Sequence, residues 1–332
     1  MLPHHRKIKN SHLFRDRLRP GYEKCNGCRV CTLPCPVWRE TRDISLTHCG
    51  RARAIQCGAS PEDIRESIMT CILCGACESV CPFGIDTVGM TIDLRYMLNK
   101  EKTGPESGEE RISENPGRKG IYSRLFLPGK QLRSHEQLIL NIHNFLDDHE
   151  TAIAYDDGSD ISLAVESGIS VSGERKGQFI RSISGARELV VADGILQRVL
   201  RKWLHDVKVT GLGMAILNKI NFKRLPGPED LYIIETRGYN SAHGEMVREY
   251  DSIRKKTGCQ MNMDLHRSAI PTGSGSVYLN AVSPEEQARW IIKGREFKRI
   301  IVENPEDISV FRKVTDVEVI HVSDLVKGRH NG

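Results

Sequence analysis

The sequence predicts an α + α/β protein, in which an all-helical N-terminal domain is followed by a duplicated α/β domain. Three observations lead to this prediction. Ten of the eleven cysteines lie between Cys25 and Cys81. After residue 121, short apolar runs alternate with amphipathic helical patterns, as expected for sheets covered by helices. Within that second part, one strand–helix–strand pattern occurs twice.

Length and composition narrow the class of protein. The chain has 332 residues, of which 39% are hydrophobic and 27% charged, as is typical of globular domains. The sequence has no apolar stretch of the roughly 18 residues that a membrane span needs. Met1 to Asn10 are polar and basic, unlike a signal peptide. We therefore expect a cytoplasmic protein, which a partner could bring to a membrane. In a reducing compartment, cysteines bind metal more often than they form disulfides.

Charge and composition divide the chain further. Residues 1–24 carry seven Lys or Arg side chains against Asp16 and Glu23, an excess equal to the net charge of the whole protein, +5. This basic arm fits an acidic partner protein, an anionic surface or a solvated tail. No nucleic-acid-binding motif follows it, so nucleic acid is not an expected partner. Residues 101–120 are rich in Gly, Pro and charge and predict a linker between domains at 25–100 and 121–332.

The clustered cysteines form two runs with one spacing. Each run reads C-x2-C-x2-C-x3-C-P, first at Cys25, Cys28, Cys31, Cys35 and Pro36, and again at Cys71, Cys74, Cys77, Cys81 and Pro82. This is the spacing of bacterial ferredoxins that hold two 4Fe–4S clusters. Zinc is the alternative, but zinc sites use paired C-x2-C units. The runs therefore favour two 4Fe–4S clusters.

In this motif, the fourth cysteine of each run ligates the cluster of the other run. We therefore expect two crossed ligand sets. One cluster would be held by Cys25, Cys28, Cys31 and Cys81, and the other by Cys71, Cys74, Cys77 and Cys35. The proline after each fourth cysteine would turn the chain away from the cluster.

Helical signals lie between and after the runs. Ser60 as N-cap with Pro61 at the first helical position predicts one helix. Asp86 is expected to cap a second helix that extends to Leu98. Cys49 and Cys57 lie outside the runs and are expected to pack as free thiols, with a redox role as the alternative. The region resembles the all-helical two-cluster domain of succinate dehydrogenase iron–sulfur subunits and heterodisulfide reductase subunits.

The second part of the chain reads as alternating strands and helices. The predicted strands are Thr151–Tyr155, Glu188–Ala192, Leu231–Glu235, Ser276–Asn280, Arg299–Val302 and Val317–Val322. The predicted helices are His135–Asp147, Ile195–His205, Ala242–Lys256 and Pro284–Glu296. The repeat pairs Glu188–Trp203 with Arg299–Val314 and Asp206–Val209 with Asp316–Val319, at an offset of 111 and then 110 residues.

A helical two-cluster domain followed by a duplicated α/β domain resembles the iron–sulfur subunits of heterodisulfide reductase, glycolate oxidase and anaerobic glycerol-3-phosphate dehydrogenase. In that family each α/β repeat carries a cysteine-rich motif, and these motifs build a substrate-active cluster. Here the corresponding places hold other residues, and Cys259 is the single cysteine of this part of the chain. The replacing residues are Gly238, Pro271, Thr272, Asn304 and Asp307 in the second repeat, with Asp193 and Leu196 in the first. One thiolate cannot hold a cubane, so we expect Cys259 to be a packed thiol.

The resemblance implies an electron-transfer subunit of a heterodisulfide reductase-like complex. It would relay single electrons through two 4Fe–4S clusters between a flavoprotein and a catalytic, iron–sulfur or membrane partner. The sequence names no catalytic residue, and the chain is expected to be one component of an oxidoreductase. The alternative is a reductase of a thiol, a disulfide or a small acid, with a residual pocket lined by Arg237, His243, His266 and Arg267. A zinc-bearing scaffold is a third hypothesis.

Overall fold

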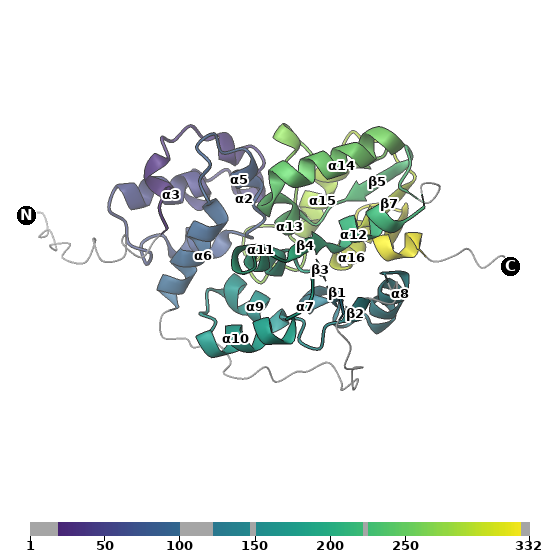
Figure 1. The fold of residues 1–332 in the computed structure, drawn as a ribbon. Helices are drawn as coiled ribbons and strands as arrows, with labels where there is room; N and C mark the ends of the chain where they lie inside the picture. The colour runs from purple at the N-terminus through teal and green to yellow at the C-terminus, as the bar shows by residue number, and fades with distance from the viewer. Residues whose placement is uncertain (1–18, 100–121, 147–150, 222–224, 327–332) are drawn as a thin grey trace, which may run out of the picture.

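The computed structural model describes residues 19–99, 122–146, 151–221 and 225–326. The predicted linker and most of the predicted basic arm therefore lie outside the described residues. The helices of the cysteine-rich part lie beside a larger part that contains two sheets (Figure 1).

Before residue 99 the described chain consists of short helices and 3-10 turns. They are η1 Tyr22–Lys24, η2 Val30–Thr32, α2 Pro36–Thr41, η3 Ile44–Leu46, α3 His48–Gln56, α4 Arg65–Thr70, α5 Ala76–Ser79 and α6 Thr87–Leu98. Asp86 caps α6 by accepting a hydrogen bond from the Gly89 N–H at 2.8 Å, as predicted. Arg19 is ion-paired with Asp93 at 2.7 Å, so residues 19–24 of the predicted arm belong to the folded part.

The predicted helix start at Ser60 is wrong. The Ser60 N–H and hydroxyl both donate to the Asp63 carboxylate at 2.8 Å, and this local bonding closes a turn. Helix α4 begins only at Arg65. The Asp63 N–H also donates to the Ser60 hydroxyl at 3.3 Å, so the two residues form the reciprocal bonds of a capping box around a turn that is not part of α4.

The second part contains two parallel four-stranded sheets with the same strand order, β2-β1-β3-β4 and β6-β5-β7-β8. The first sheet belongs to β1 Arg124–Leu127, α7 Gly129–Leu132, α8 Glu136–Leu146, β2 Thr151–Ile153, α9 Ser159–Ser167, α10 Gly173–Ser182, β3 Glu188–Val191, α11 Gly194–Trp203, β4 Lys208–Gly211 and α12 Leu212–Lys219. The second belongs to β5 Asp230–Ile233, α13 Thr236–Ser241, α14 His243–Thr257, β6 Gln260–Met261, η5 Leu265–Arg267, α15 Pro284–Ile292, β7 Arg299–Val302, α16 Glu306–Arg312, β8 Glu318–His321 and η6 Val322–Leu325.

The two strand–helix–strand units of the sequence repeat occupy matching places in the two sheets. The unit β3–α11–β4 lies at the end of the first sheet, and β7–α16–β8 lies at the end of the second. Residues 189–191 and 300–302 are all buried, because both faces of a parallel sheet are covered. This arrangement is what the repeat leads one to expect, while a duplication of the gene segment stays a prediction.

One predicted strand is absent from the sheets. Residues 276–280 form an irregular segment, in which Val277 and Leu279 are exposed. The segment is held to α9 because the Val277 N–H donates to the Glu166 carboxylate at 2.9 Å and the Ser276 hydroxyl donates to it at 3.2 Å. These side-chain bonds take the place of a strand partner.

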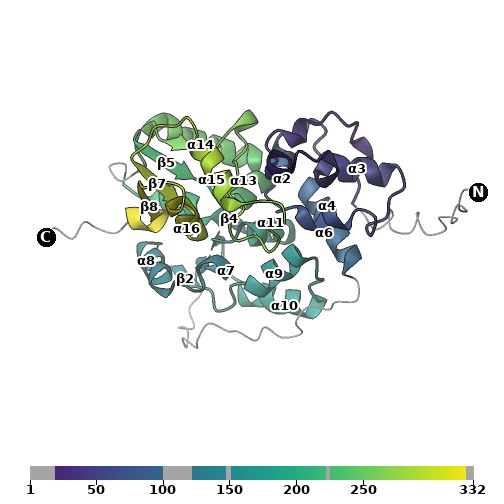
Figure 2. The same ribbon diagram turned by 180° about the vertical axis from the view of Figure 1, so that it is seen from behind.

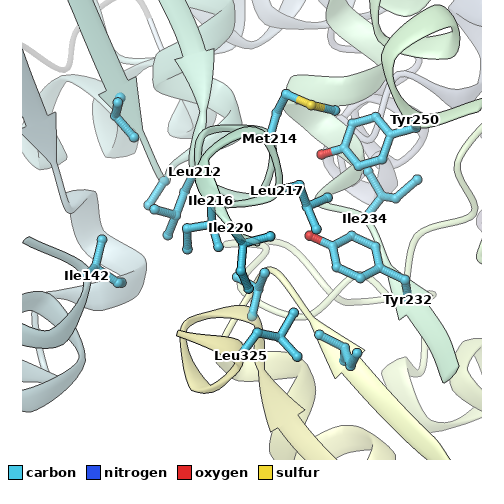
Figure 3. Packing of buried hydrophobic residues seen from close by; sticks show 14 of the residues in the cluster. Ile142, Leu212, Met214, Ile216, Leu217, Ile220, Tyr232, Ile234, Tyr250 and Leu325 are labelled. Carbon is cyan, nitrogen blue, oxygen red and sulfur yellow. The ribbon is translucent and has the colours of Figure 1, made fainter. Parts of the chain in front are cut away.

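Helix α12 lies between the two sheets and joins their cores (Figure 3). Leu212 and Ile216 lie on the side of α12 that faces Ile142 of α8, whereas Met214 and Leu217 lie on the side of Tyr232 and Tyr250. The apolar cluster that they form includes residues of β1, β3, β5 and β7. The two sheets therefore share one hydrophobic core.

The cysteine-rich part packs against the α/β part on the side of α11 and α13 (Figure 2). Leu73, Val88 and Ile92 belong to the same apolar cluster as Leu127 and Leu196 of the first sheet's region. Helix α11 also carries an ion pair to the helical part, from Arg198 to Glu78 at 2.7 Å. The two parts of the chain are thus joined by apolar and charged contacts.

Candidate iron–sulfur centres

The eight cysteines of the two runs line two cavities. The first, named the outer cavity, encloses about 280 Å³ and is lined by Cys25, Cys28, Cys31 and Cys81. The second, named the inner cavity, encloses about 400 Å³ and is lined by Cys35, Cys71, Cys74 and Cys77. In the described ranges, no three His, Cys, Asp or Glu side chains converge as closely as a single metal ion requires. Each set of four thiols surrounds a space, and the fourth cysteine of each run lies with the first three of the other run.

The backbone of each run bends in the same way. In both runs the residues on either side of the second cysteine have positive φ, Gly27 at 81° and Arg29 at 65°, then Leu73 at 55° and Gly75 at 75°. Such a conformation costs energy for residues with a side chain, and it is often found in functional loops. At Gly75 a Cβ would approach the Asn240 Cβ to 2.9 Å, so the second run is shaped against α13.

Burial raises the pKa of four of these thiols in the protein without metal. Burial, together with the neighbouring thiols, raises the pKa of Cys31 to about 12. Burial likewise raises the pKa of Cys35, Cys74 and Cys77. Coordination by a metal removes this cost, because a coordinating thiol is deprotonated. The donor set therefore fits a group that binds four thiolates at once.

Two buried arginines lie beside the inner cavity, and neither has a carboxylate partner within the described part of the chain. Arg51 lines the cavity and donates to the Ser67 carbonyl at 2.7 Å. Arg95 is fully buried and donates to the carbonyls of Glu166, at 2.5 Å, and Cys71. Buried charge requires compensation. An anionic, thiolate-ligated cluster in the inner cavity would supply it.

One hydroxyl contacts a predicted ligand. The Thr87 Oγ1 lies 2.8 Å from the Cys77 Sγ. Thr87 is the first residue of α6, and its position is fixed by the cap residue Asp86, which also accepts from Lys202 at 2.9 Å. With Cys77 bound as a thiolate, the hydroxyl would donate to the sulfur, and such hydrogen bonds raise the potential of a cluster.

His48 lies between the two cavities. Among the described residues it alone lines both of them. Its side chain, on the first residue of α3, is 4% exposed, and neither ring nitrogen has a hydrogen-bond partner. Burial, helped by the nearby charge of Arg51, lowers the pKa of His48 to about 3, so the ring is neutral at pH 7. Sequence reasoning missed this residue because no spacing rule marks it.

The three cysteines outside the runs have different surroundings. Cys49 is buried and lines the outer cavity with the four predicted ligands, so the expectation that it only packs overlooked a fifth thiol there. Cys57 is exposed at the end of α3, and the prediction of a packed thiol is wrong for it, because the helix has ended and its apolar face no longer covers the residue. Cys259 is buried in the core, as predicted.

A third cavity, named the sheet-edge cavity, lies where β5 and β7 end. It encloses about 360 Å³, and Ile72 and Cys74 line both it and the inner cavity. Its remaining walls are mainly polar and include Gln131, Glu235, Thr236, Arg237, Thr272, Ser274, Asn304 and Asp307. Burial raises the pKa of Glu235 to about 7 and that of Asp307 to about 6.

Several residues that were expected to replace the cysteines of the resembling family meet in this cavity. Pro271, Thr272, Asn304 and Asp307 line it. The Thr272 hydroxyl donates to the Asp307 carboxylate at 2.5 Å. A hydroxyl–carboxyl network thus stands where thiolates would be. The corresponding residues of the first repeat do not line it.

Of the residues proposed for a residual pocket, the structure brings one to this cavity. Arg237 lines it and is ion-paired with Glu166 at 2.9 Å. His243, His266 and Arg267 do not line it. The Tyr239 hydroxyl donates to the Arg267 carbonyl at 2.8 Å, so the loop that carries Arg267 packs against α13. Proximity of these residues along the chain does not bring them into a shared pocket.

Comparison with known proteins bears on the cysteine-rich part. Residues 21–85 match the model of the 4Fe-4S dicluster domain family. The chain is also similar to the "Probable glycolate oxidase iron-sulfur subunit" of Bacillus subtilis (strain 168), with 28% identity over 142 residues. That alignment covers 40% of this chain and 30% of the relative, so it spans less than a third of the relative's length.

No solved structure matches the chain. Within the described ranges, every helix is too short or too polar to cross a membrane. The family match, the spacing of the two runs and the thiol-lined cavities agree on the kind of group. They support iron–sulfur clusters as the group that the N-terminal cysteines bind.

Proposed function

We propose that this chain is the electron-transfer subunit of an oxidoreductase and holds two 4Fe–4S clusters, one in each thiol-lined cavity. The observation that carries the proposal is the sorting of the eight cysteines into two sets of four. Cys25, Cys28, Cys31 and Cys81 would hold the cluster of the outer cavity. Cys71, Cys74, Cys77 and Cys35 would hold that of the inner cavity. When bound, the clusters supply one-electron chemistry.

The protein around the cavities would set how easily each cluster accepts an electron. The inner cavity has apolar walls that include Val37, Ile72 and Val88, and these side chains keep water away from the thiols. Arg51 and Arg95 place positive charge beside it. Burial, hydrogen bonds and nearby charge are the means by which proteins tune cluster potentials.

The two cavities give the relay an outer and an inner end. The outer cavity reaches the surface, because Cys28 is exposed and Phe83 is 40% exposed. The inner cavity shares Cys74 with the sheet-edge cavity of the α/β part. We propose that a redox partner docks at the outer end and that single electrons pass between the two clusters.

We infer the partners by analogy. The name of the Bacillus relative describes one subunit of a larger oxidase, and the sequence resembles heterodisulfide reductase subunits in its helical part. A flavoprotein on one side and a catalytic, iron–sulfur or membrane subunit on the other would fit a relay in the cytoplasm. Anaerobic purification of the tagged chain from its native host, with identification of the proteins that accompany it, tests this. Isolation of the chain without any redox protein would count against a subunit role.

Iron analysis and paired cysteine variants test the clusters. The anaerobically purified full chain should contain about eight irons, as two cubanes require. In EPR spectra of the reduced protein, Cys35→Ser should damage the same signal as Cys71→Ser, and Cys81→Ser the same signal as Cys25→Ser. If Cys35→Ser instead matches Cys25→Ser, the crossed assignment is wrong. Zinc in place of iron would end the electron-transfer proposal.

The sheet-edge cavity favours a second candidate function. It is polar, it touches the proposed ligand Cys74, and its wall includes Arg237, whose guanidinium is held by Glu166. The chain could therefore be a reductase in which a thiol, a disulfide or a small acid binds at the inner end of the relay. Reduction of such a compound by the purified chain with a chemical electron donor, and its loss in Asp307→Asn, would support this function. If Asp307→Asn does not change the rate of that reduction, the sheet-edge cavity is not its site, and electron relay is then the remaining candidate function.

A further inference from the structure

His48 has an environment that protein atoms alone do not explain. Its ring is 4% exposed, and both ring nitrogens lack a hydrogen-bond partner. A buried polar group without a hydrogen-bond partner destabilises the fold, because it loses its bonds to water and gains none in return. A leucine or phenylalanine would fill the same space without that cost, so a histidine here calls for a partner outside the described protein.

The position of the ring shows where that partner would be. Among the described residues, His48 alone lines both the outer and the inner cavity. Its neighbour Cys49 faces the outer cavity, and Arg51, one turn further along α3, faces the inner one. The start of α3 is therefore inserted between the two thiol sets.

A neutral imidazole carries one N–H donor and one acceptor nitrogen. The groups that would fill the two cavities have sulfur atoms at their surfaces, and these atoms accept hydrogen bonds. A single N–H from the dividing wall can reach one of the two sets, so its effect should fall on one centre more than on the other.

We propose that His48 donates a hydrogen bond from its ring to a sulfur of one of the two clusters and thereby raises the potential of that cluster above the value it would otherwise have. This inference rests on the proposed function, because it requires a cluster in each cavity. It goes beyond that function by naming a residue that sets a difference between the two potentials. The physical reason is that a hydrogen bond to sulfur stabilises the more negative, reduced cluster more than the oxidised one.

The test is an EPR-monitored redox titration of the full chain with the variants His48→Phe and His48→Gln. Phenylalanine keeps a planar ring and removes the N–H, whereas glutamine keeps an N–H donor. Ile85→Val serves as the matched control, because Ile85 is buried and lines the outer cavity without a polar group. Thr87→Val identifies the signal of the inner cavity, because Thr87 contacts Cys77.

For one of the two signals, we expect His48→Phe to lower the ratio of reduced to oxidised cluster about tenfold at a fixed potential. This change corresponds to a decrease of about 59 mV in the reduction potential of a one-electron couple. His48→Gln should recover at least half of that shift, and Ile85→Val should leave both potentials within a third of it. Unchanged potentials in His48→Phe with full iron content would overturn the inference. So would an equal shift in His48→Phe and His48→Gln, since that result would indicate packing alone.

Two further outcomes separate this inference from the proposed function. If the unmodified chain shows no pair of 4Fe–4S signals, the proposed function fails before any variant is compared. If His48→Phe loses iron, His48→Gln decides the test. Retention of both clusters in His48→Gln with a near-normal potential supports the donor role of His48. Loss of iron in His48→Gln as well overturns that role.

Discussion

The buried carboxylate of Glu166 should be a main source of stability at the junction between α9, α13 and the irregular segment at 276–280. Glu166 lies in α9 with a side chain that is 0% exposed. It pairs with Arg237 of α13 at 2.9 Å and with Lys130 of α7 at 2.6 Å, and it accepts from the Val277 N–H at 2.9 Å. Replacement by glutamine keeps the shape but leaves the buried Arg237 without its counter-charge.

The magnitude follows from the pKa of the carboxyl group. Burial acts to raise this pKa, but the charges of Arg237 and Lys130 outweigh burial and hold it at about 2, below its ordinary value of 4.5. A difference of this size corresponds to about 3 kcal/mol of folding free energy at pH 7. Breaking a buried ion pair by removal of one partner costs a similar ~3–5 kcal/mol. We therefore expect Glu166→Gln to lose about 3 kcal/mol.

The assay is guanidinium unfolding of the anaerobic holoprotein at pH 7, followed by circular dichroism. The matched control is Glu188→Gln, because Glu188 also pairs with two cations, Arg124 and Lys208, but Lys208 is largely exposed. The control should lose less than ~1 kcal/mol. Because the folded pKa of Glu166 is lowered, its contribution is complete above pH 4.5 and is lost as the pH falls toward 2. Equal unfolding midpoints for the two variants would refute the reasoning.

Three other changes probe the cavities. Thr87→Val removes the hydroxyl at 2.8 Å from Cys77, so the potential of the inner cluster should fall by about 59 mV. A redox titration in which the signal damaged by Cys25→Ser moves, and not the signal damaged by Cys71→Ser, would contradict this expectation. Cys49→Ala should keep about eight irons, since the predicted ligands are complete without it; loss of the outer signal would make Cys49 a ligand. Gly75→Ala forces a Cβ to within 2.9 Å of Asn240 on a backbone with φ of 75°, so iron analysis should show loss of iron from the inner cavity. The control is Gly244→Ala, where nothing lies near the added Cβ, and its iron content should be unchanged.

The cysteine spacing carried most of the information about the candidate site. A period of three residues between ligands, repeated twice, is enough to predict two centres and the crossing of the fourth ligand. The surroundings of the centres could not be predicted in this way. His48 and Cys49 reach the cavities because α3 folds back over the first run, and Arg95 of α6 reaches the Cys71 carbonyl beside the inner cavity. These are tertiary contacts, which leave no spacing signal in the sequence.

The fold of the second part was predictable where local patterns are strong. Arg299–Val302 forms β7 with the predicted bounds, and Ser283 caps α15 at Pro284 as its sequence indicates. The strands β1 and β6 were not predicted, and β6, with two residues, is too short to give a pattern. At residues 276–280 the pattern of alternating apolar residues predicted a strand that does not form. The apolar residues are exposed there, in a segment held by the Glu166 carboxylate.

The lack of cysteine motifs in the α/β part does not make that part dispensable for the proposed relay. Asn240 of α13 donates to the Cys74 carbonyl at 2.9 Å, and Arg198 of α11 holds Glu78 at 2.7 Å in α5, which lies within the second run. Leu73 is buried in a cluster whose other members come largely from the first sheet's region. Removal of the α/β part would expose the inner cavity to water and leave these groups without partners. In the proposed relay, the α/β part would therefore have a physical task, which is to close the inner cavity and to hold the second run in its strained conformation.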